Sequence, residues 1–272
     1  MLDHQGNLMK EYLDLSGEEI RKLRLSGKLS AKEILLASEE RIGVLNGALK
    51  AIVSKRSPTA LTEAVQIDET GDLSGLLGLP VAIKDLNDVQ GLATTYGSTL
   101  FKDNIATKDD DVVASVRQNN GIIVGKTNVP EHGFGATTTS PIFGACGNPF
   151  DPNLSSGAST GGGAVAVASG MAVYATGSDF AGSLRTPAAF CGVCGIRPSN
   201  GIVATDRRSL AWSSFDVEGP MARTAADCKR LLMHMAKSDP SDPLSAVPDP
   251  NLFEEPKKVK LENLKVAVSE DL

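Results

Sequence analysis

The chain has 272 residues, of which 41 % are hydrophobic, enough for one large core or two modest ones. Its formal net charge of −6 argues against a nucleic acid or an anionic membrane as the main partner, since both select for basic surfaces. The first residues contain no cationic stretch followed by an apolar run, so no secretory signal is predicted and the cytoplasm is the expected location.

The N-terminal part, 1–70, is predicted to be mainly helical. Residues 16–19 and 30–33 both fit the S-x-x-E capping box, in which a serine and a glutamate satisfy free N–H groups at a helix start. We therefore expect helices that begin near Gly17 and Ala31.

Strands and helices then alternate along the chain. A short strand is expected at 49–53, followed by a helix with Ser57 as its N-cap and Pro58 in its first turn. Residues 77–85, LGLPVAIKD, are typical of a buried strand, and 109–128 are typical of a helix, a glycine stop and a second strand. Helices that alternate with apolar strands predict the α/β class, with a sheet covered by helices on both faces.

The composition changes in the middle of the chain. Residues 132–196 contain only three charged residues, Asp151, Asp179 and Arg185, among many glycines, alanines, serines and threonines. This stretch has too much Gly and Ser, and too little Leu, Ile and Phe, for a membrane span, so it predicts closely packed buried backbone. The elements expected in it are a loop at 137–159, a helix at about 162–171, a strand at 173–176, a loop through Ser183, a helical turn opened by Thr186 and Pro187, and a strand from Gly192.

The C-terminal part is predicted to contain one more helix and one more strand. The helix is opened by Thr224 and Asp227, because apolar residues then recur at helical spacing. A polar, proline-rich loop is expected at 238–256. It leads to 264–272, LKVAVSEDL, an apolar pattern typical of a buried strand.

The segment GASTGGG at 157–163 contains Gly-x-Ser-x-Gly, the pattern of the nucleophile elbow in α/β-hydrolases. That elbow needs a strand directly before the serine and a histidine further along the chain. Here a turn-rich loop precedes Ser159, and the downstream histidine, His234, lies on the flank of the amphipathic helix. A phosphate-binding loop is not indicated either, because no Gly-Lys-Ser/Thr follows Gly163.

Cys191 and Cys194 form a C-x-x-C, which can be a redox or zinc half-site. No second C-x-x-C and no histidine cluster accompanies it, and the surrounding AAFCGVCGI is typical of an apolar core. We therefore expect no metal and no cofactor.

Serine chemistry without histidine needs another base, and a lysine can serve. An ordinary lysine, with a pKa near ~10.4, is almost entirely protonated at neutral pH, so a catalytic lysine must be desolvated. Lys84 is a candidate because it ends the apolar run LPVAI. The alternative is an ordinary surface pair of Lys84 with Asp85, which the spacing by itself favours.

Three segments, 78–98, 148–201 and 219–235, resemble the amidase signature family. The resemblance runs from about Ser16 to Leu272. It implies an α/β/α fold with a mixed central sheet covered by helices on both faces, and a Ser-cisSer-Lys triad that hydrolyses amides.

Carried over position by position, the resemblance implies that Lys84 is the base, that Ser159 follows a cis peptide bond and relays the proton, and that Ser183 is the nucleophile. The oxyanion hole is implied to consist of the backbone N–H groups of Phe180, Ala181, Gly182 and Ser183. The supporting residues are Ser155, Ser156 and Thr160, expected to hydrogen-bond the loop and the triad, and Asp179 with Arg185, expected to pair across it.

The sequence departs from the family pattern in two ways. Ala181 replaces a common glycine beside the nucleophile, and in a conformation with positive φ it would cost about 1–2 kcal/mol. Family members also continue past Leu272, so the chain is expected to be incomplete at its C-terminus. The expected organisation is one amidase-signature domain, 1–272, with a helical portion at 1–70, a catalytic core at 76–237, a proline-rich loop at 238–256 and the start of a truncated second half at 257–272.

The leading functional hypothesis is an amidase that hydrolyses a non-peptide carboxylic amide to an acid and ammonia or an amine, through an acyl-Ser183 intermediate. One alternative is the glutaminase subunit of a tRNA-dependent amidotransferase, which shares this signature. The other is a truncated, catalytically incomplete member of the family. The expected partners are a small-molecule amide and, to cover exposed surface, a homodimer or a complementing chain, without direct contact to nucleic acid or membrane.

Overall fold

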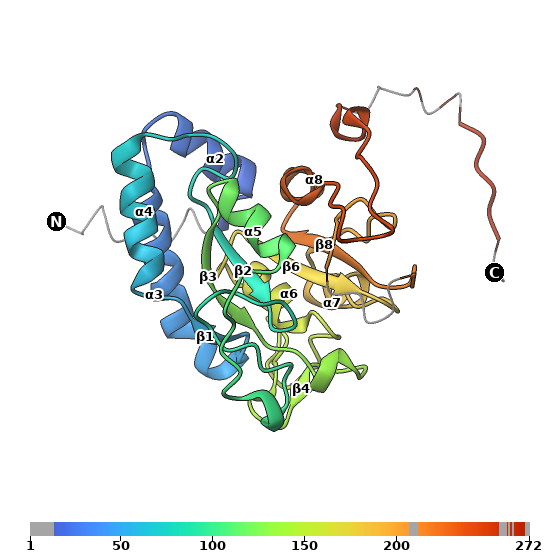
Figure 1. Cartoon of the computed structure of the whole chain (residues 1–272), viewed down its shortest axis with the longest axis horizontal. Helices are drawn as coiled ribbons and strands as arrows, with labels where there is room; N and C mark the ends of the chain where they lie inside the picture. The colour runs from blue at the N-terminus through green and yellow to red at the C-terminus, as the bar shows by residue number, and fades with distance from the viewer. Residues whose placement is uncertain (1–13, 207–211, 256–259, 261, 263, 270–272) are drawn as a thin grey trace.

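The computed structural model describes residues 14–206, 212–255, 260, 262 and 264–269 (Figure 1). Within these residues the largest sheet has six strands in the order β1-β3-β2-β6-β8-β7. Its bounds are β1 Ile52–Lys55, β2 Pro80–Lys84, β3 Ile122–Thr127, β6 Tyr174–Asp179, β7 Cys194–Gly195 and β8 Val217–Ala222. The pairs β2–β3 and β2–β6 are parallel, whereas β1–β3, β6–β8 and β7–β8 are antiparallel. The mixed sheet of an α/β protein is thus confirmed.

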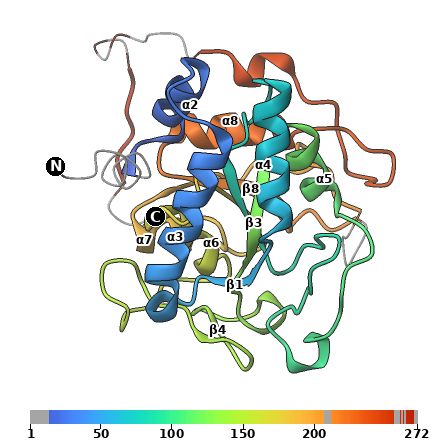
Figure 2. The same ribbon diagram turned by 90° about the vertical axis from the view of Figure 1, so that its left-hand side faces the viewer.

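Helices cover both faces of this sheet, as predicted. Their bounds are α2 Gly17–Leu25, α3 Ala31–Leu49, α4 Thr59–Thr70, α5 Asp111–Gln118, α6 Gly161–Ala168, α7 Arg185–Cys191 and α8 Ala225–Met235. Along β2, Val81 and Ile83 pack into one apolar cluster with α5 and α8, and Ala82 packs into a second cluster with α3, α6 and α7. Figure 1 shows α3 and α4 side by side next to the sheet, and Figure 2 looks at the molecule from their side.

The two predicted capping boxes start α2 and α3. Ser16 Oγ accepts a hydrogen bond from Glu19 N at 3.2 Å, and Ser30 Oγ accepts one from Glu33 N at 3.0 Å. The predicted cap of α4 is wrong by one residue. That helix begins at Thr59 with Pro58 at the N-cap, because the Ser57 hydroxyl is directed to the Glu39 carboxylate of α3 instead.

Other predicted elements shift in their bounds. The strand expected at 49–53 is β1, which begins only at Ile52 because Leu49 still belongs to α3. The loop expected at 137–159 contains a short hairpin, formed by β4 Thr139–Ser140 and β5 Gly144–Ala145. The helical turn expected at Thr186 is α7.

The strand predicted at 264–272 is wrong for its described part. Residues 264–269 form no strand, and Leu264, Val266 and Val268 are 49 %, 76 % and 86 % exposed. A strand needs a neighbouring strand to satisfy its backbone N–H and C=O groups, and these residues pair with none in the described part of the chain. An apolar pattern therefore did not suffice to form a strand.

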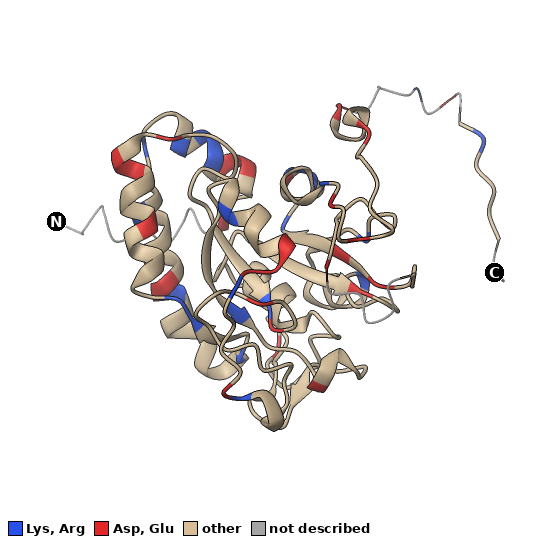
Figure 3. Cartoon of the chain, viewed as in Figure 1, with Lys and Arg blue, Asp and Glu red and all other residues tan. Residues whose placement is uncertain are grey.

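The small residues of the middle segment allow α6 to pack directly on the sheet. A Cβ atom built on Gly163 would lie 3.3 Å from Ala175 Cβ of β6, and one on Gly162 would lie 2.4 Å from the Asn128 backbone N. Larger side chains would push the helix off the strands. Figure 3 shows charged residues of both signs on the outer helices α2, α3 and α4. Among the described helices, none has the length and apolarity that crossing a bilayer requires.

Candidate active site

The candidate site lies where the parallel strands β2 and β6 end. Lys84 is the last residue of β2, and Ser178 is the residue before the last of β6. Ser159 lies in the loop that leads into α6, and Ser183 lies between β6 and α7. Ligand sites of α/β sheets form at the carboxyl ends of the strands, because connecting loops meet there.

Lys84 is fully buried, and among the described residues its ammonium group makes hydrogen bonds only to serine oxygens. Its Nζ lies 2.9 Å from Ser159 Oγ, 2.9 Å from Ser178 Oγ and 3.3 Å from the Ser178 carbonyl oxygen. Burial lowers the pKa of Lys84, although the negative charges of Glu218, Asp216 and Asp179 act in the opposite direction. The side chain therefore loses its proton more easily than a solvated lysine does.

The surface pair of Lys84 with Asp85, which spacing favoured, is wrong. Asp85 is fully buried and its Oδ1 lies 2.9 Å from Nζ of Lys126, which lies opposite Ile83 in the parallel β2–β3 pair. Asp85 also accepts hydrogen bonds from the backbone N–H and hydroxyl of Thr95. Lys84 and Asp85 thus have different partners: Lys84 contacts serine oxygens, and Asp85 contacts Lys126.

Ser159 and Ser183, the two serines expected to react, line the same cavity, which has a volume of about 1340 Å³. Ser159 is buried and follows a cis peptide bond from Ala158. Ser183 is half-buried, and its hydroxyl makes no hydrogen bond to any other described residue. The Ser183 carbonyl accepts a hydrogen bond from Thr160 N at 3.2 Å, which ties the two loops together. The structure thus places Ser159 and Ser183 on one cavity, with Lys84 buried behind Ser159 and within hydrogen-bond distance of its hydroxyl.

Asp179 organises the loop between β6 and α7. Its carboxylate accepts hydrogen bonds from Gly182 N at 2.8 Å and Leu184 N at 3.2 Å, and it pairs with Arg185 Nε at 3.0 Å. Arg197 Nη1 lies 3.1 Å from the same carboxylate. Burial favours the neutral acid, but the hydrogen bonds from Arg185, Gly182 and Leu184 outweigh it and lower the pKa of Asp179.

The backbone donors expected in the oxyanion hole differ in their availability. The Gly182 N–H is bound to Asp179, whereas those of Phe180, Ala181 and Ser183 make no hydrogen bond to the rest of the described chain. Gly182 takes the positive φ, at 110°, and Ala181 does not have one. The strain considered for Ala181 is therefore absent, because the neighbouring glycine adopts the conformation that alanine would resist.

The remaining predicted supporting residues hold the loop before α6. Ser155 Oγ accepts from Gly157 N at 3.1 Å, and Ser156 Oγ donates to the Cys146 carbonyl at 3.0 Å. Thr160 Oγ1 donates to the Ser178 carbonyl at 3.4 Å, so it touches the same peptide as Lys84. These contacts orient backbone and do not point to a chemical step.

A match to known proteins covers most of the chain. The family model described as Amidase matches residues 33–272. The chain belongs to the amidase family. It is 37 % identical over 262 residues to an acylamidase of Rhodococcus erythropolis, covering 95 % of this chain and 55 % of that relative. It is 40 % identical over 230 residues to a glutamyl-tRNA(Gln) amidotransferase subunit of Chromohalobacter salexigens, covering 82 % of this chain and 47 % of that relative.

Solved structures of amidase signature enzymes share the fold. A peptide amidase from Stenotrophomonas maltophilia superposes with a TM-score of 0.81 at 30 % identity, over 90 % of this chain and 52 % of that one. A bacterial aryl acylamidase of the amidase signature family also gives a TM-score of 0.81 at 30 % identity, over 86 % of this chain and 50 % of that one. This amidase-family chain spans about half the length of the curated relatives it matches.

Several residues of this amidase-family site were missed from sequence. Ser178 and Glu218 face each other in the antiparallel β6–β8 pair, and Asn87 Nδ2 donates to Glu218 Oε1 at 3.1 Å. The Lys126–Asp85 pair was missed as well. These contacts join segments far apart in the chain, so only the alignment of the strands could have revealed them.

No metal site is found in the described part of this amidase-family chain, where no group of three or more His, Cys, Asp or Glu side chains is placed to hold an ion. All four cysteines are free, and Cys191 is buried in the apolar core. Cys191 therefore occupies a core position, as the sequence indicated, whereas Cys194 is half-buried and packs against the other apolar cluster.

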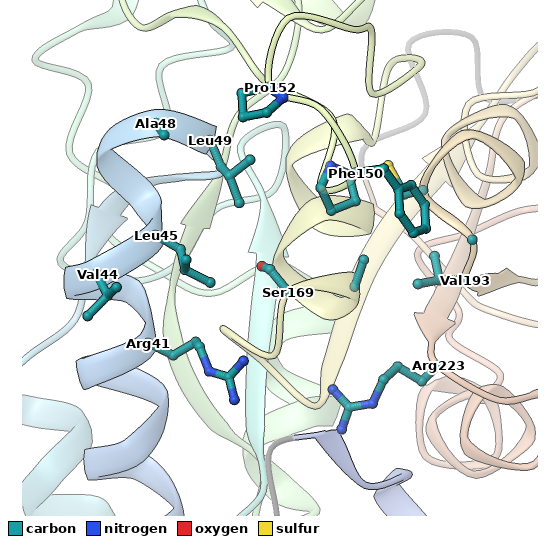
Figure 4. Close-up of a pocket in the computed structure, with 14 residues that line it drawn as sticks. Arg41, Val44, Leu45, Ala48, Leu49, Phe150, Pro152, Ser169, Val193 and Arg223 are labelled. Carbon is teal, nitrogen blue, oxygen red and sulfur yellow. The ribbon is translucent and has the colours of Figure 1, made fainter. Parts of the chain in front are cut away.

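A second cavity, of about 550 Å³, is lined by residues of α3 and by residues at the ends of α6 and α7 (Figure 4). Leu45 and Leu49 form part of its apolar wall, and Arg41 and Arg223 lie at one end. Both guanidinium groups already have protein partners, since Arg41 pairs with Asp14 at 3.2 Å and Arg223 donates to the Leu15 and Val167 carbonyls. The cavity contains no residue of the candidate active site.

Proposed function

We propose that the chain carries the catalytic centre of an amidase, which hydrolyses a non-peptide carboxylic amide to an acid and ammonia or an amine. One observation carries the proposal. Lys84 is a fully buried lysine whose Nζ contacts Ser159 Oγ and Ser178 rather than a carboxylate. A buried amine with neutral partners can act as a base at moderate pH, which an ion-paired lysine cannot do.

The proposed reaction begins with a proton relay. Neutral Lys84 takes the proton of the Ser159 hydroxyl while Ser159 Oγ takes the proton of Ser183, whose Oγ forms a bond to the carbonyl carbon of the amide. This step requires Ser183 Oγ to turn toward Ser159 when substrate binds, since hydrogen bonds at catalytic centres often tighten only in the complex. The proton then returns along the same path to the leaving nitrogen, and the C–N bond breaks.

The acyl group is released by water in a second step. Water attacks the acyl-Ser183 carbonyl, its proton passes to Ser159 and Lys84, and the acid leaves with restoration of the Ser183 hydroxyl. In both steps the negative charge on the carbonyl oxygen needs donors, and the N–H groups of Phe180, Ala181 and Ser183 are proposed for it. Loss of one such donor typically costs about 2.7–4 kcal/mol of transition-state stabilisation.

Hydrolysis of a panel of amides tests the proposal. The purified protein is incubated with aryl and alkyl carboxamides, and the released ammonia or amine is quantified. We expect turnover by the wild type, none by Ser183→Ala, and unchanged turnover by Ser169→Ala, whose hydroxyl bonds the Val165 carbonyl away from the site. Equal turnover by wild type and Ser183→Ala would refute the assignment.

A second candidate function is supported by the 40 % identity to a glutamyl-tRNA(Gln) amidotransferase subunit. In that role the same centre would hydrolyse glutamine and deliver ammonia to other subunits. Glutamine turnover that appears only with co-purifying chains would favour this role, and turnover of simple amides by the chain alone would exclude it. A folded chain that is inactive in both assays would support the interpretation as an incomplete family member. The cytoplasmic location stays a prediction.

A further inference from the structure

The cavity that contains Ser159 and Ser183 has a wall that the proposed mechanism does not use. Glu218, at the start of β8, lines this wall together with Asp216 and Asp206. Neither the relay nor the oxyanion donors require a carboxylate there. Glu218 is therefore free to contact another part of the substrate.

Strand pairing places Glu218 beside the reacting groups. It lies directly opposite Ser178 in the antiparallel β6–β8 pair, and directly opposed residues direct their side chains to the same face. Ser178 Oγ in turn lies 2.9 Å from Lys84 Nζ. A group bound by Glu218 would therefore sit within a short distance of the amide that Ser183 attacks.

One oxygen of Glu218 is buried without a partner. The side chain is 8 % exposed, and Oε1 accepts a hydrogen bond from Asn87 Nδ2 at 3.1 Å. Oε2 is buried and has no hydrogen-bond partner among the described residues, although the residue lines the cavity. An unsatisfied buried acceptor is energetically costly, so a ligand that donates a hydrogen bond to it gains affinity.

The lysines near the cavity do not supply that donor. An ammonium group has three N–H donors, and Lys84 Nζ already contacts three oxygens, on Ser159 and Ser178. Lys108, at the cavity wall, donates to Asp206 at 3.0 Å. Burial and the nearby Asp216 raise the pKa of Glu218, so an arriving cation would favour its ionised form.

The rest of the cavity suits an organic cation. Its lining includes the apolar side chains of Leu86, Tyr96, Phe134 and Phe180. The faces of aromatic rings contact apolar groups and also attract cations. A carboxylate on one wall and aromatic rings on another match an ammonium group attached to an apolar frame.

We propose that Glu218 is a specificity-determining residue that binds an ammonium group of the substrate, so that the enzyme prefers amides with a positive charge near the scissile bond over neutral amides of the same shape. The reaction in this inference rests on the proposed function, whereas the binding of the cation does not. A kinetic arm and a binding arm therefore test it separately.

The kinetic arm uses two pairs of substrates that differ only in charge. β-Alanyl-p-nitroanilide and butanoyl-p-nitroanilide place the charge on the acyl side, and N-(2-aminoethyl)benzamide and N-propylbenzamide place it on the amine side. The quantity measured is the ratio of kcat/KM for the charged and neutral member of each pair. Because both members depend on Lys84 equally, this ratio cancels any effect of Glu218 on the base.

In the wild type we expect a ratio of about 10 or more in one pair, equivalent to about 1.4 kcal/mol of discrimination. Glu218→Gln should lower that ratio to near one, and Glu218→Asp, which keeps the charge, should retain a preference for the cation. The control Glu69→Gln removes an exposed carboxylate of α4 and should leave the ratio unchanged. A wild-type ratio near one in both pairs, or the same ratio in Glu218→Gln, would overturn the proposal.

The binding arm decides the matter even if none of the four amides is hydrolysed. Benzylammonium is titrated into the wild type and Glu218→Gln by calorimetry, with thermal unfolding of both proteins as the check on folding. We expect a Kd about 10-fold or more weaker in Glu218→Gln, as for a removed charge-assisted hydrogen bond. Equal affinity of the two folded proteins, or no binding to the wild type, would refute the cation site without bearing on the amidase proposal.

Discussion

Two fully buried lysines stand at the ends of neighbouring strands, and their partners differ in kind. Lys126 of β3 forms an ion pair with Asp85 at 2.9 Å and donates to Thr94 Oγ1 at 3.0 Å. Lys84 of β2 contacts hydroxyl and carbonyl oxygens of Ser159 and Ser178. Burial lowers the pKa of both lysines, and the contact with Asp85 opposes this at Lys126.

The difference shows that burial alone does not decide whether a lysine keeps its proton. A buried lysine in contact with a carboxylate keeps its proton, because losing it would leave a buried negative charge uncompensated. A buried lysine among neutral oxygens can exchange its proton with them. We therefore propose a structural role for Lys126 and, within the proposed amidase reaction, a chemical role for Lys84, and the following variants separate the two.

The largest effect is expected for Lys84→Met, which keeps an unbranched side chain and removes the base. We expect kcat/KM to fall by about 10³-fold or more, in the range typical of general-base removal. The unfolding free energy should not fall, since a buried amine that is costly to charge has been removed. Amide hydrolysis and urea unfolding measure the two quantities, and a variant with near wild-type kcat/KM would end the assignment of Lys84 as base.

Lys126→Met should show the opposite pattern. It leaves the buried carboxylate of Asp85 without its counter-ion, which typically costs about 3–5 kcal/mol of stability. Urea unfolding should show that loss, and adding Asp85→Asn should recover part of it, because the uncompensated charge is then gone. If Lys126→Met is as stable as the wild type, the ion pair does not have the structural role assigned to it.

The pH dependence of hydrolysis should reflect the lowered pKa of Lys84. Only the neutral amine can accept a proton, so kcat/KM should rise with pH and level off below the ordinary lysine value of ~10.4. Because the folded-state pKa is the lower one, the unfolded chain binds more protons between the two values, and stability contributed by Lys84 should rise with pH there. A rising limb centred near the ordinary lysine value would contradict the effect of burial.

The smallest effect is expected for Thr94→Val, which removes the hydroxyl that accepts from Lys126 Nζ at 3.0 Å and donates to the Asn87 carbonyl at 3.3 Å. We expect a loss of about 1–3 kcal/mol of stability, as for two hydrogen bonds, and an unchanged kcat/KM. The matched variant Ser178→Ala removes the hydroxyl that contacts Lys84 Nζ. In contrast to Thr94→Val, it should lower kcat/KM. Equal effects of the two variants on kcat/KM would erase the distinction between the lysines.

Local signals in the sequence predicted the elements that depend on local contacts. The capping boxes at Ser16 and Ser30 satisfy backbone groups within one turn, so their residues alone sufficed to place the starts of α2 and α3. The resemblance to the amidase signature family likewise indicated Lys84, Ser159 and Ser183 from residue patterns alone. The predicted C-terminal strand was wrong for residues 264–269, which pair with no strand among the described residues.

Contacts between distant segments could not be predicted in the same way. Glu218 meets Ser178 only through the register of β6 and β8, which lie far apart in the chain. Spacing alone favoured a pair of Asp85 with its neighbour Lys84, although successive residues of an extended chain point to opposite faces. Asp85 instead meets Lys126 of the adjacent strand. The register of the strands therefore determines both the ion pair of Asp85 with Lys126 and the position of Glu218 beside Ser178.

The most direct test of the proposed relay is covalent labelling of the serine nucleophile. The wild type, Ser183→Ala and Lys84→Met are treated with a fluorophosphonate, and the modified residue is located by peptide mass spectrometry. We predict a single label on Ser183 in the wild type, no label in Ser183→Ala, and labelling slowed by about 10²-fold or more in Lys84→Met, as expected when a general base is lost. Equal labelling of wild type and Ser183→Ala, or a label on Ser159, would contradict the relay from Lys84 through Ser159 to Ser183.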